Sequence, residues 1–276
     1  TENVVRSIDL LIIDEISMVR CDMLDATDMI LRHYRKSRKP FGGVQIVMFG
    51  DLFQLCPVVK KEEWDTLKEY YKSLYFFSCY AFKKLKYRVI ELKKVYRQAD
   101  REFIDLLNDI RTAKVKLADI QQLNTRYEPN YVPKVKSNVV TLMTHIHKTN
   151  DWNEMMFSKI RNKLRTYDAK ARDWYGERFP VAYHLELKVG ARVMFQRNDN
   201  IGHQYVNGTL GWVKALHEDS IVVKKDDGEL VNVERAKWEQ YNYFVDKKTK
   251  TIYTEVSGTF TQFPLKLAWA VSIHKS

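Results

Sequence analysis

The chain has 276 residues, 45% of them hydrophobic and 13% aromatic, and 46 Lys and Arg against 35 Asp and Glu give a formal net charge of +11. No window approaches the run of about eighteen apolar residues that a membrane span needs, and the polar start TENVVRS lacks the pattern of a signal peptide, so we expect a soluble, intracellular chain. Three cysteines far apart, Cys21, Cys56 and Cys79, indicate neither a disulfide framework nor a zinc cluster.

The excess of positive charge is concentrated in two segments. Lys83 to Arg97 holds seven basic residues and one acidic residue, and Pro133 to Arg172 holds nine basic and three acidic residues. Both segments also carry aromatic side chains, among them Tyr87 and Trp152. Basic charge interleaved with aromatic rings suits a polyanion whose bases can stack. A solvated, lysine-rich surface is the competing interpretation.

The first part of the chain predicts a parallel α/β sheet. The apolar run at residues 10–13 fits a strand buried on both faces, from whose carboxyl end Asp14 and Glu15 must emerge. Residues 22–35 fit an amphipathic helix, and VQIVMFGD gives a second buried strand that ends at Asp51. Two strands joined by a helix form a βαβ crossover, in which the acidic groups at both strand ends face one crevice. Such a crevice is typical of sites for nucleotide phosphates and magnesium.

Strands and helices continue to alternate in the middle of the chain. YRVIEL, residues 87–92, predicts a third strand, and the apolar spacing of FIDLLNDI predicts a helix around residues 103–110. SNVVTLM predicts a further strand, and DWNEMMFSKIRNKL predicts a further helix.

From about Leu187 the pattern changes to short strands separated by turns. The runs ARVMFQR, LGWVKAL, SIVVKK, LVNVERA and TIYTEV alternate with turns such as Asn207-Gly208 and Asp226-Asp227-Gly228. This predicts a small antiparallel barrel. The final run, PLKLAWAVSIHKS, returns to an apolar strand.

Five motifs, in the expected order, resemble those of the Pif-like and RecD-like branch of superfamily one helicases. DEISM is similar to a Walker B motif, and GDLFQL resembles the third helicase motif. VYRQADREF carries an Arg-Gln pair of the family type, VNGTLGWV resembles the family's Asn-Gly-x-x-Gly turn, and PLKLAWAVSIHKS resembles the start of the DNA-contacting fifth motif. Any strand can end in two acids, so it is the order of all five motifs that identifies the family.

The resemblance implies a site for ATP and Mg²⁺. It implies that Asp14 coordinates the magnesium ion, that Glu15 is the catalytic base, and that Gln54, with Asp51 behind it, senses the γ-phosphate. Arg97 matches the arginine that reaches the phosphates from the second domain and stabilises charge in the transition state. A plainer interpretation of Arg97 is an exposed charge at the start of a helix. For Asp14 and Glu15, a purely structural role is the weakest explanation, because ionised carboxylates at a strand end need a cation or a hydrogen-bond partner.

The resemblance also implies contacts with single-stranded DNA. The implied residues are Thr144, His145, Asn153, Asn207, Ser272, His274 and Lys275. His145 and His147 could instead seed a metal site, because two imidazoles two residues apart in a strand point to one side, but no third ligand with suitable spacing follows. His274 could instead be a packed residue at the end of a strand.

The sequence departs from the family pattern in two ways. Cys56-Pro57 stands where the family usually has Pro-Pro, which removes one fixed φ and keeps the second. No G-x-x-x-x-G-K-[ST] phosphate loop occurs, and the chain stops at HKS, before the Gln-Gly that completes the fifth motif. We therefore expect an internal piece of a helicase, which hydrolyses ATP negligibly by itself.

The predicted architecture is α/β, with two RecA-like domains of the P-loop NTPase type and an inserted small barrel of Src-homology-three type. The predicted ranges are 1–85 for the C-terminal part of the first RecA-like domain, 86–186 and 262–276 for the second, and 187–261 for the barrel. The predicted function is that of an ATP-dependent 5′-to-3′ DNA helicase, a monomer that acts on single-stranded DNA and duplex junctions and has no membrane partner. It would be cytoplasmic in a bacterium, and nuclear or mitochondrial in a eukaryote. The alternatives are a non-catalytic single-stranded DNA-binding module and a RecD-like subunit of a nuclease complex.

Overall fold

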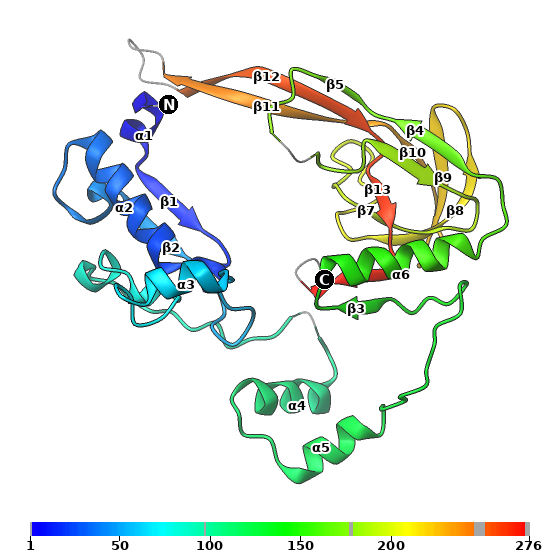
Figure 1. Ribbon diagram of the computed structural model, residues 1–276, viewed down its shortest axis with the longest axis horizontal. Helices are drawn as coiled ribbons and strands as arrows, with labels where there is room; N and C mark the ends of the chain where they lie inside the picture. Colours follow the sequence, from blue (N-terminus) through cyan, green and yellow to red (C-terminus); the bar gives the residue numbers. More distant parts are fainter. Residues whose placement is uncertain (1, 97, 177–178, 246–251, 274–276) are drawn as a thin grey trace. The chain divides into compact units, whose positions relative to one another are not determined.

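The computed structural model describes residues 2–96, 98–176, 179–245 and 252–273 of the chain (Figure 1). The chain divides into two compact units: unit 1 comprises residues 1–130 and 244–253, and unit 2 comprises residues 131–243 and 254–276. Within the described ranges, no helix combines the length and the apolar character needed to cross a membrane.

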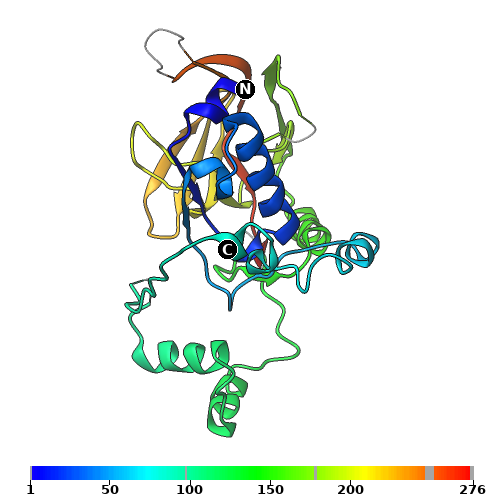
Figure 2. The ribbon, with the colours of Figure 1, turned by 90° about the vertical axis from the view of Figure 1, so that its left-hand side faces the viewer.

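A pair of parallel strands forms the centre of unit 1. Strands β1 (Leu10–Ile13) and β2 (Gln45–Met48) pair in register, with Ile13 opposite Met48. Helix α2 (Cys21–Arg35) connects them and runs alongside the pair (Figures 1 and 2). The βαβ order predicted from the sequence is therefore present.

Only one face of this strand pair is packed. Leu11 and Ile13 lie against a cluster that contains Leu24 and Leu31 of α2, whereas Leu10 and Ile12 are 47% and 58% exposed. The prediction of a strand buried on both faces is wrong for the described residues. The reason is that α2 covers one side of the pair, and no described element covers Leu10 and Ile12 on the other.

The break after α2 depends on a glycine and a buried carboxylate. In the short 3-10 turn η2 (Pro40–Gly43), Gly42 has a φ of +63°, and a Cβ added there would lie 2.7 Å from the carbonyl oxygen of Leu31. The buried side chain of Asp28 accepts a hydrogen bond from the backbone N–H of Phe41 at 2.5 Å. This close approach lets the chain turn back sharply into β2.

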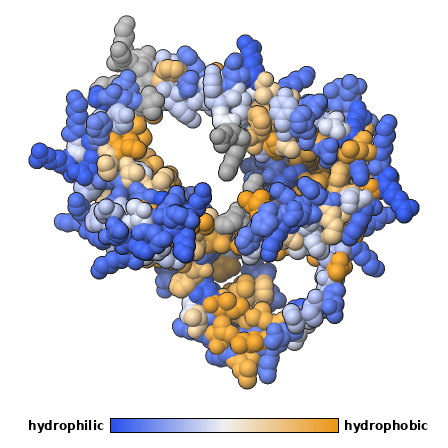
Figure 3. All heavy atoms as spheres, viewed as in Figure 1, coloured by the Kyte–Doolittle hydropathy of each residue, from blue (hydrophilic) through white to orange (hydrophobic). Residues whose placement is uncertain are grey.

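The rest of unit 1 consists of short helices and irregular chain. Its helical elements are α1 (Glu2–Ser7), η1 (Ile16–Met18), α3 (Lys61–Leu67), η3 (Phe76–Ser78), η4 (Phe82–Lys84), α4 (Arg101–Arg111) and α5 (Leu117–Asn124). Helix α4 confirms the helix predicted around residues 103–110. Apolar side chains gather on the surface over α4 and α5 (Figure 3), among them Phe103, Leu107, Ile110, Leu117, Ile120 and Leu123.

The strand predicted at residues 87–92 is not formed. Residues 85–96 have no regular secondary structure, and Val89, Ile90 and Leu92 are 79%, 77% and 84% exposed. A strand needs a neighbouring strand to satisfy its backbone hydrogen bonds. The two-stranded sheet of unit 1 contains only β1 and β2, so this β-prone segment has no partner among the described residues.

A five-stranded antiparallel sheet forms the main core of unit 2. Its strand order is β10-β9-β8-β7-β13, and its core side chains, such as Val213, Ile221 and Val233, have no exposed surface. The strands are β7 (Arg192–Phe195), β8 (Leu210–Leu216), β9 (Ser220–Lys225), β10 (Leu230–Glu234) and β13 (Leu265–Leu267). The first four correspond to runs that the sequence predicts as short strands.

The fifth predicted run, TIYTEV, belongs to a different sheet. It lies in β12 (Ile252–Gln262), which is hydrogen-bonded between β11 (Ala236–Val245) and β5 (Lys170–Arg172). Phe260 of β12 is fully buried in a separate aromatic cluster with Trp174 and Trp238. Strands β4 (Arg165–Asp168) and β6 (His184–Leu187) form a further antiparallel pair.

Unit 2 also contains a second parallel pair. Strand β14 (Ala270–Ser272) pairs with β3 (Thr141–Met143), and helix α6 (Ile146–Ser158) follows β3. The side chain of Asn153 on α6 donates to the carbonyl oxygen of Ala270 at 3.0 Å and accepts from its N–H at 2.9 Å. The final apolar run therefore returns beside a strand from much earlier in the chain.

Candidate nucleotide site and nucleic-acid surface

The first group of predicted site residues, the carboxylates expected to bind Mg²⁺ and nucleotide, lies at the carboxyl end of β1 in unit 1. Asp14 and Glu15 follow the strand directly and are both exposed. Glu15 has a φ of 51°, in the left-handed region, and its N–H donates to Asp14 Oδ1 at 3.0 Å. A left-handed glutamate is uncommon and costs on the order of 1 kcal/mol or more. The tight turn keeps both carboxylates at the strand end.

Gly50 allows the chain after β2 to approach this turn. The N–H of Phe49 donates to the carbonyl of Ile13 at 2.9 Å, and the N–H of Ile16 donates to the carbonyl of Phe49 at 2.8 Å. A Cβ added to Gly50 would lie 2.8 Å from Ile16 Cγ2 and 3.1 Å from the backbone nitrogen of Ile16. Because these contacts are too short for a side chain, only glycine fits here. Asp51, the next residue, therefore reaches the same sheet edge as Asp14.

Asp51 organises the turn that carries Gln54. Its Oδ1 accepts from the backbone N–H of Phe53 at 3.1 Å, and its Oδ2 accepts from Gln54 Nε2 at 3.1 Å. Arg111, at the end of α4, donates to Oδ1 at 3.1 Å. Burial raises the pKa of Asp51, but these three donors outweigh it, and the pKa lies below its ordinary value. The carboxylate is therefore ionised at neutral pH.

Arg111 was not among the residues predicted for the site. The sequence signal available for it is a basic residue in the last turn of a predicted helix, which is common because it complements the helix dipole. Its contact with Asp51 depends on how the chain between residues 51 and 111 folds, and sequence spacing alone does not reveal this.

Among the described residues, no group of three or more His, Cys, Asp or Glu side chains is arranged to hold a metal ion. The rings of His145 and His147 lie 5.3 Å apart between centroids, and no third ligand joins them in the described chain. An exposed carboxylate such as Asp14 nevertheless fits magnesium in a nucleotide site, because Mg²⁺ is usually held there by one or two carboxylates, phosphate oxygens and water.

The second candidate group lies in unit 2, where β3 leads into α6. Thr144 and His145 are exposed, and Thr144 Oγ1 lies 2.7 Å from His145 Nδ1 in a hydrogen bond. Ser272 pairs with Met143, the residue before Thr144, so the carboxyl ends of β14 and β3 meet here. The free backbone N–H groups and the dipole at the N-terminus of α6 favour a phosphate at this place.

Two predicted DNA contacts have little exposed surface. Asn153 is 6% exposed and Ser272 is 7% exposed. Because the donor and the acceptor of the Asn153 side chain are both bonded to Ala270, this side chain joins α6 to β14, which indicates a structural role.

Asn207 is exposed in the turn between β7 and β8. Its N–H donates to Asn198 Oδ1 at 2.7 Å, and Gly208 after it has a φ of +92°. The turn predicted from Asn-Gly is therefore present. The predicted site residues that lie outside the described ranges are Arg97, His274 and Lys275.

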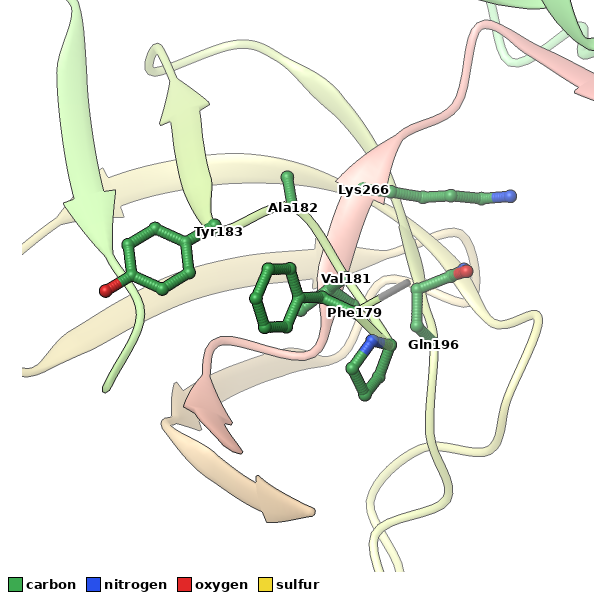
Figure 4. Close-up of a pocket in the computed structure, with 7 residues that line it drawn as sticks. Phe179, Val181, Ala182, Tyr183, Gln196 and Lys266 are labelled. Atoms are coloured by element: carbon green, nitrogen blue, oxygen red, sulfur yellow. The ribbon is translucent and has the colours of Figure 1, made fainter. Parts of the chain in front are cut away.

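A cavity of about 420 Å³ occupies another part of unit 2 (Figure 4). In Figure 4, the side chains of Gln196 and Lys266 lie on one side of it, and the rings of Phe179 and Tyr183 lie on the other. Its lining is completed by Pro180, Val181 and Ala182. None of the predicted site residues lines this cavity.

Comparisons with known proteins agree with the motif order. Residues 1–121 match the family described as PIF1-like helicase. The ATP-dependent DNA helicase PIF1 of Danio rerio is 32% identical over 274 residues, which cover 96% of this chain and 40% of that relative. The ATP-dependent DNA helicase Pif1 of Bdellovibrio bacteriovorus is 30% identical, with 98% of this chain and 58% of the relative covered.

Solved structures give the same relationship. Bacteroides sp. Pif1 in complex with ADP-AlF4 is 40% identical with a TM-score of 0.90, and the match covers 100% of this chain and 63% of that one. Bacteroides Pif1 bound to ssDNA is 40% identical with a TM-score of 0.63 over the same coverage. Together with the parallel pairs β1–β2 and β3–β14, these neighbours fit the predicted RecA-like α/β fold. The chain spans about two fifths of the length of its vertebrate relatives.

Proposed function

We propose that this chain, a relative of the Pif1-like helicases over nearly all of its length, is the part of an ATP-dependent 5′-to-3′ DNA helicase that supplies its catalytic carboxylates and much of its single-stranded DNA surface. The observation that carries the proposal is the contact at Gly50, which brings the Asp14–Glu15 turn and the Asp51–Gln54 turn to one sheet edge. A longer protein would add the phosphate loop G-x-x-x-x-G-K-[ST].

The proposed roles at the nucleotide follow from this geometry. Asp14 would hold Mg²⁺, which neutralises charge on the phosphates when bound. Glu15, exposed one residue further, orients and deprotonates the attacking water. The hydrogen bond from Gln54 Nε2 to Asp51 fixes the rotation of the Gln54 amide, which suits a sensor of the γ-phosphate. Arg97 would stabilise transition-state charge.

The proposed DNA surface combines phosphate and base contacts. Thr144 and His145 at the N-terminus of α6 would bind backbone phosphates, and Asn207, His274 and Lys275 would add polar and basic contacts. The basic segments 83–97 and 133–172 supply the long-range attraction. Bacteroides Pif1 has been solved bound to ssDNA, which supports this class of ligand.

The predicted domain plan remains part of the proposal. Residues 1–85 form the C-terminal part of the first RecA-like domain, residues 86–186 with 262–276 form the second, and residues 187–261 form a barrel of Src-homology-three type. The pairing of β14 with β3 supports the return of the chain to the second domain. The five-stranded sheet supports the barrel. We also propose a monomer, with duplex junctions as substrates.

The function is tested in a protein that contains this chain and a phosphate loop. Phosphate release is measured with and without single-stranded DNA, and unwinding is measured on forked duplexes with a 5′ or a 3′ tail. DNA-stimulated hydrolysis with unwinding of the 5′-tailed substrate is expected. DNA binding without hydrolysis would favour the non-catalytic module, and unwinding from the 3′ tail would contradict the polarity.

A further inference from the structure

The turn that carries Gln54 is held from outside by Arg111. Arg111 Nη2 lies 3.1 Å from Asp51 Oδ1, and the guanidinium carbon lies 5.1 Å from the centroid of the Phe53 ring. The side chains of Arg111 and Asp51 are 47% and 22% exposed. Arg111 therefore touches two residues of the turn, by an ion pair and by a cation–π contact.

Asp51 links Arg111 to Gln54, because its carboxylate binds both side chains. The same carboxylate bonds the N–H of Phe53 and the side-chain amide of Gln54, and the N–H of Gln54 donates to the Asp51 carbonyl at 3.0 Å. Arg111 and Gln54 thus share one anchor. Without the guanidinium, the Asp51 carboxylate keeps its two other donors but loses its only described cationic partner, so it is held less tightly.

Arg111 is attached to a well-formed helix. Asp100 caps the N-terminus of α4 by accepting from the N–H of Phe103 at 3.1 Å, and Leu106 is buried. The helix has 11 residues, about 16 Å at the usual rise per residue. In the sequence it begins four residues after Arg97, the proposed phosphate-binding arginine, and it ends at Arg111, which contacts the Gln54 turn.

We propose that Arg111 is a positioning residue for ATP hydrolysis, which acts through Asp51 to orient Gln54 and couples that turn to α4. The proposal rests on the proposed function. An exposed ion pair contributes little to folding stability, so a purely structural Arg111 would have little measurable effect of any kind. A positioning role instead predicts a change in turnover, because a small rotation of Gln54 alters the geometry of the reacting complex and so the rate of hydrolysis.

The first test uses the longer, ATP-hydrolysing protein. Arg111→Ala is expected to lower kcat for DNA-stimulated hydrolysis by about three- to thirtyfold, the range of typical coupling effects, with KM for ATP changed less than about twofold. Arg111→Lys keeps the charge but loses the planar fork over Phe53, so it is expected to restore part of the rate. Arg101→Ala is the matched control, since it removes the same charge from the other end of α4.

The second test needs no nucleotide and uses the chain itself. Hydrogen exchange at the Phe53 and Gln54 amides is expected to accelerate in Arg111→Ala and to remain unchanged in Arg101→Ala, while the amides of β1 keep their protection. Asp51→Asn closes a double-mutant cycle, and in that background Arg111→Ala is expected to have little further effect on kcat or on exchange.

The outcomes separate the inference from the function on which it rests. Equal effects of Arg111→Ala and Arg101→Ala, or effects of Arg111→Ala and Asp51→Asn that simply add, would overturn the positioning role. A raised KM with unchanged kcat would also overturn it. If the wild-type longer protein hydrolyses no ATP while the exchange results hold, the proposed function fails and the coupling of Arg111 to the Gln54 turn survives.

Discussion

Arg192 and Asp226 form a two-pronged ion pair that joins β7 to the turn after β9. Arg192 has no exposed side-chain surface, and its Nη2 lies 2.6 Å from Asp226 Oδ2 while Nη1 donates to Oδ1. Its guanidinium carbon also lies 4.9 Å from the centroid of the Trp212 ring. The asymmetry of burial matters, because the arginine lies within the protein while Asp226 is 39% exposed.

Asp226→Asn is therefore expected to destabilise unit 2 although it alters a surface residue. The change leaves a buried guanidinium with a neutral partner, and we expect a loss of about 2 kcal/mol, less than for a fully buried pair because water reaches Asp226. Thermal or urea unfolding measures it. Asp219→Asn is the control, since Asp219 is exposed in the turn between β8 and β9. Equal losses would show that the fork contributes nothing special.

Glu15→Gln tests the proposed catalytic base in the longer protein. The substitution keeps the size of the side chain and removes its basicity, so kcat should fall by about a hundredfold or more, while ATP binding is retained. Phosphate release and binding of a fluorescent ATP analogue are the measurements. Glu69→Gln, an exposed acid in the same unit, should leave both unchanged. Loss of ATP binding together with hydrolysis would make Glu15 a structural residue.

Asn153→Ala should act on stability and leave DNA binding intact. The change leaves the N–H and the carbonyl of Ala270 without their side-chain partners at a buried position, which costs about 2 to 4 kcal/mol. Asn150→Ala, on the exposed side of α6, should cost little. Melting and single-stranded DNA affinity are measured on the same samples. A melting point like that of wild type with weakened DNA binding would restore Asn153 as a DNA contact.

Single-stranded DNA binding by this chain should be weak and depend steeply on salt. With about four phosphates neutralised, the affinity should fall roughly fiftyfold between 50 and 200 mM salt. Fluorescence anisotropy across that range gives the slope. Replacing Lys134 and Lys136 in the second basic segment should reduce the slope, whereas replacing Lys247 and Lys248 outside both segments serves as the charge-matched control. An affinity that salt does not change would exclude the basic segments as the binding surface.

The buried cysteines predict a response to alkaline pH. Burial raises the pKa of Cys79 from 9.0 to about 11, and burial also raises the pKa of Cys21. Because the folded state favours the protonated thiols, their contribution to stability is present below pH 9 and is lost as the pH rises toward 11. Urea unfolding at pH 8 and 10.5 should show the loss, and Cys79→Ala should show less of it.

Exposure of the three thiols gives an independent check at pH 8. A thiol reagent should modify the exposed Cys56 in the folded chain, and Cys21 and Cys79 only after unfolding. Rapid modification of Cys79 in the native protein would contradict its burial and with it the expected pH dependence.

Elements whose partners lie close in the sequence could be predicted from local pattern. The LLII run before Asp14, the helix at residues 22–35 and the Asn207-Gly208 turn follow from periodicity and turn chemistry, and each is present. The position of Asp14 and Asp51 at one edge of the sheet follows from the geometry of parallel strands. The order of the five motifs identified the helicase family, because the residue types in these motifs depend on the chemistry of the site and not on how the core packs.

Contacts between distant residues required the tertiary structure. The segment at residues 87–92 has the composition of a strand but remains irregular, because a strand forms only where another strand can pair with it. The resemblance implies that Asn153 contacts DNA. In the fold, however, its side-chain NH₂ donates to the carbonyl of Ala270 and its side-chain oxygen accepts from the N–H of Ala270. From the sequence, Arg111 is expected to be an ordinary charge at a helix end. In the fold, its Nη2 lies 3.1 Å from Asp51 Oδ1. The sequence determines which donors, acceptors and charges each side chain carries. Only the tertiary structure determines which partners these groups bind.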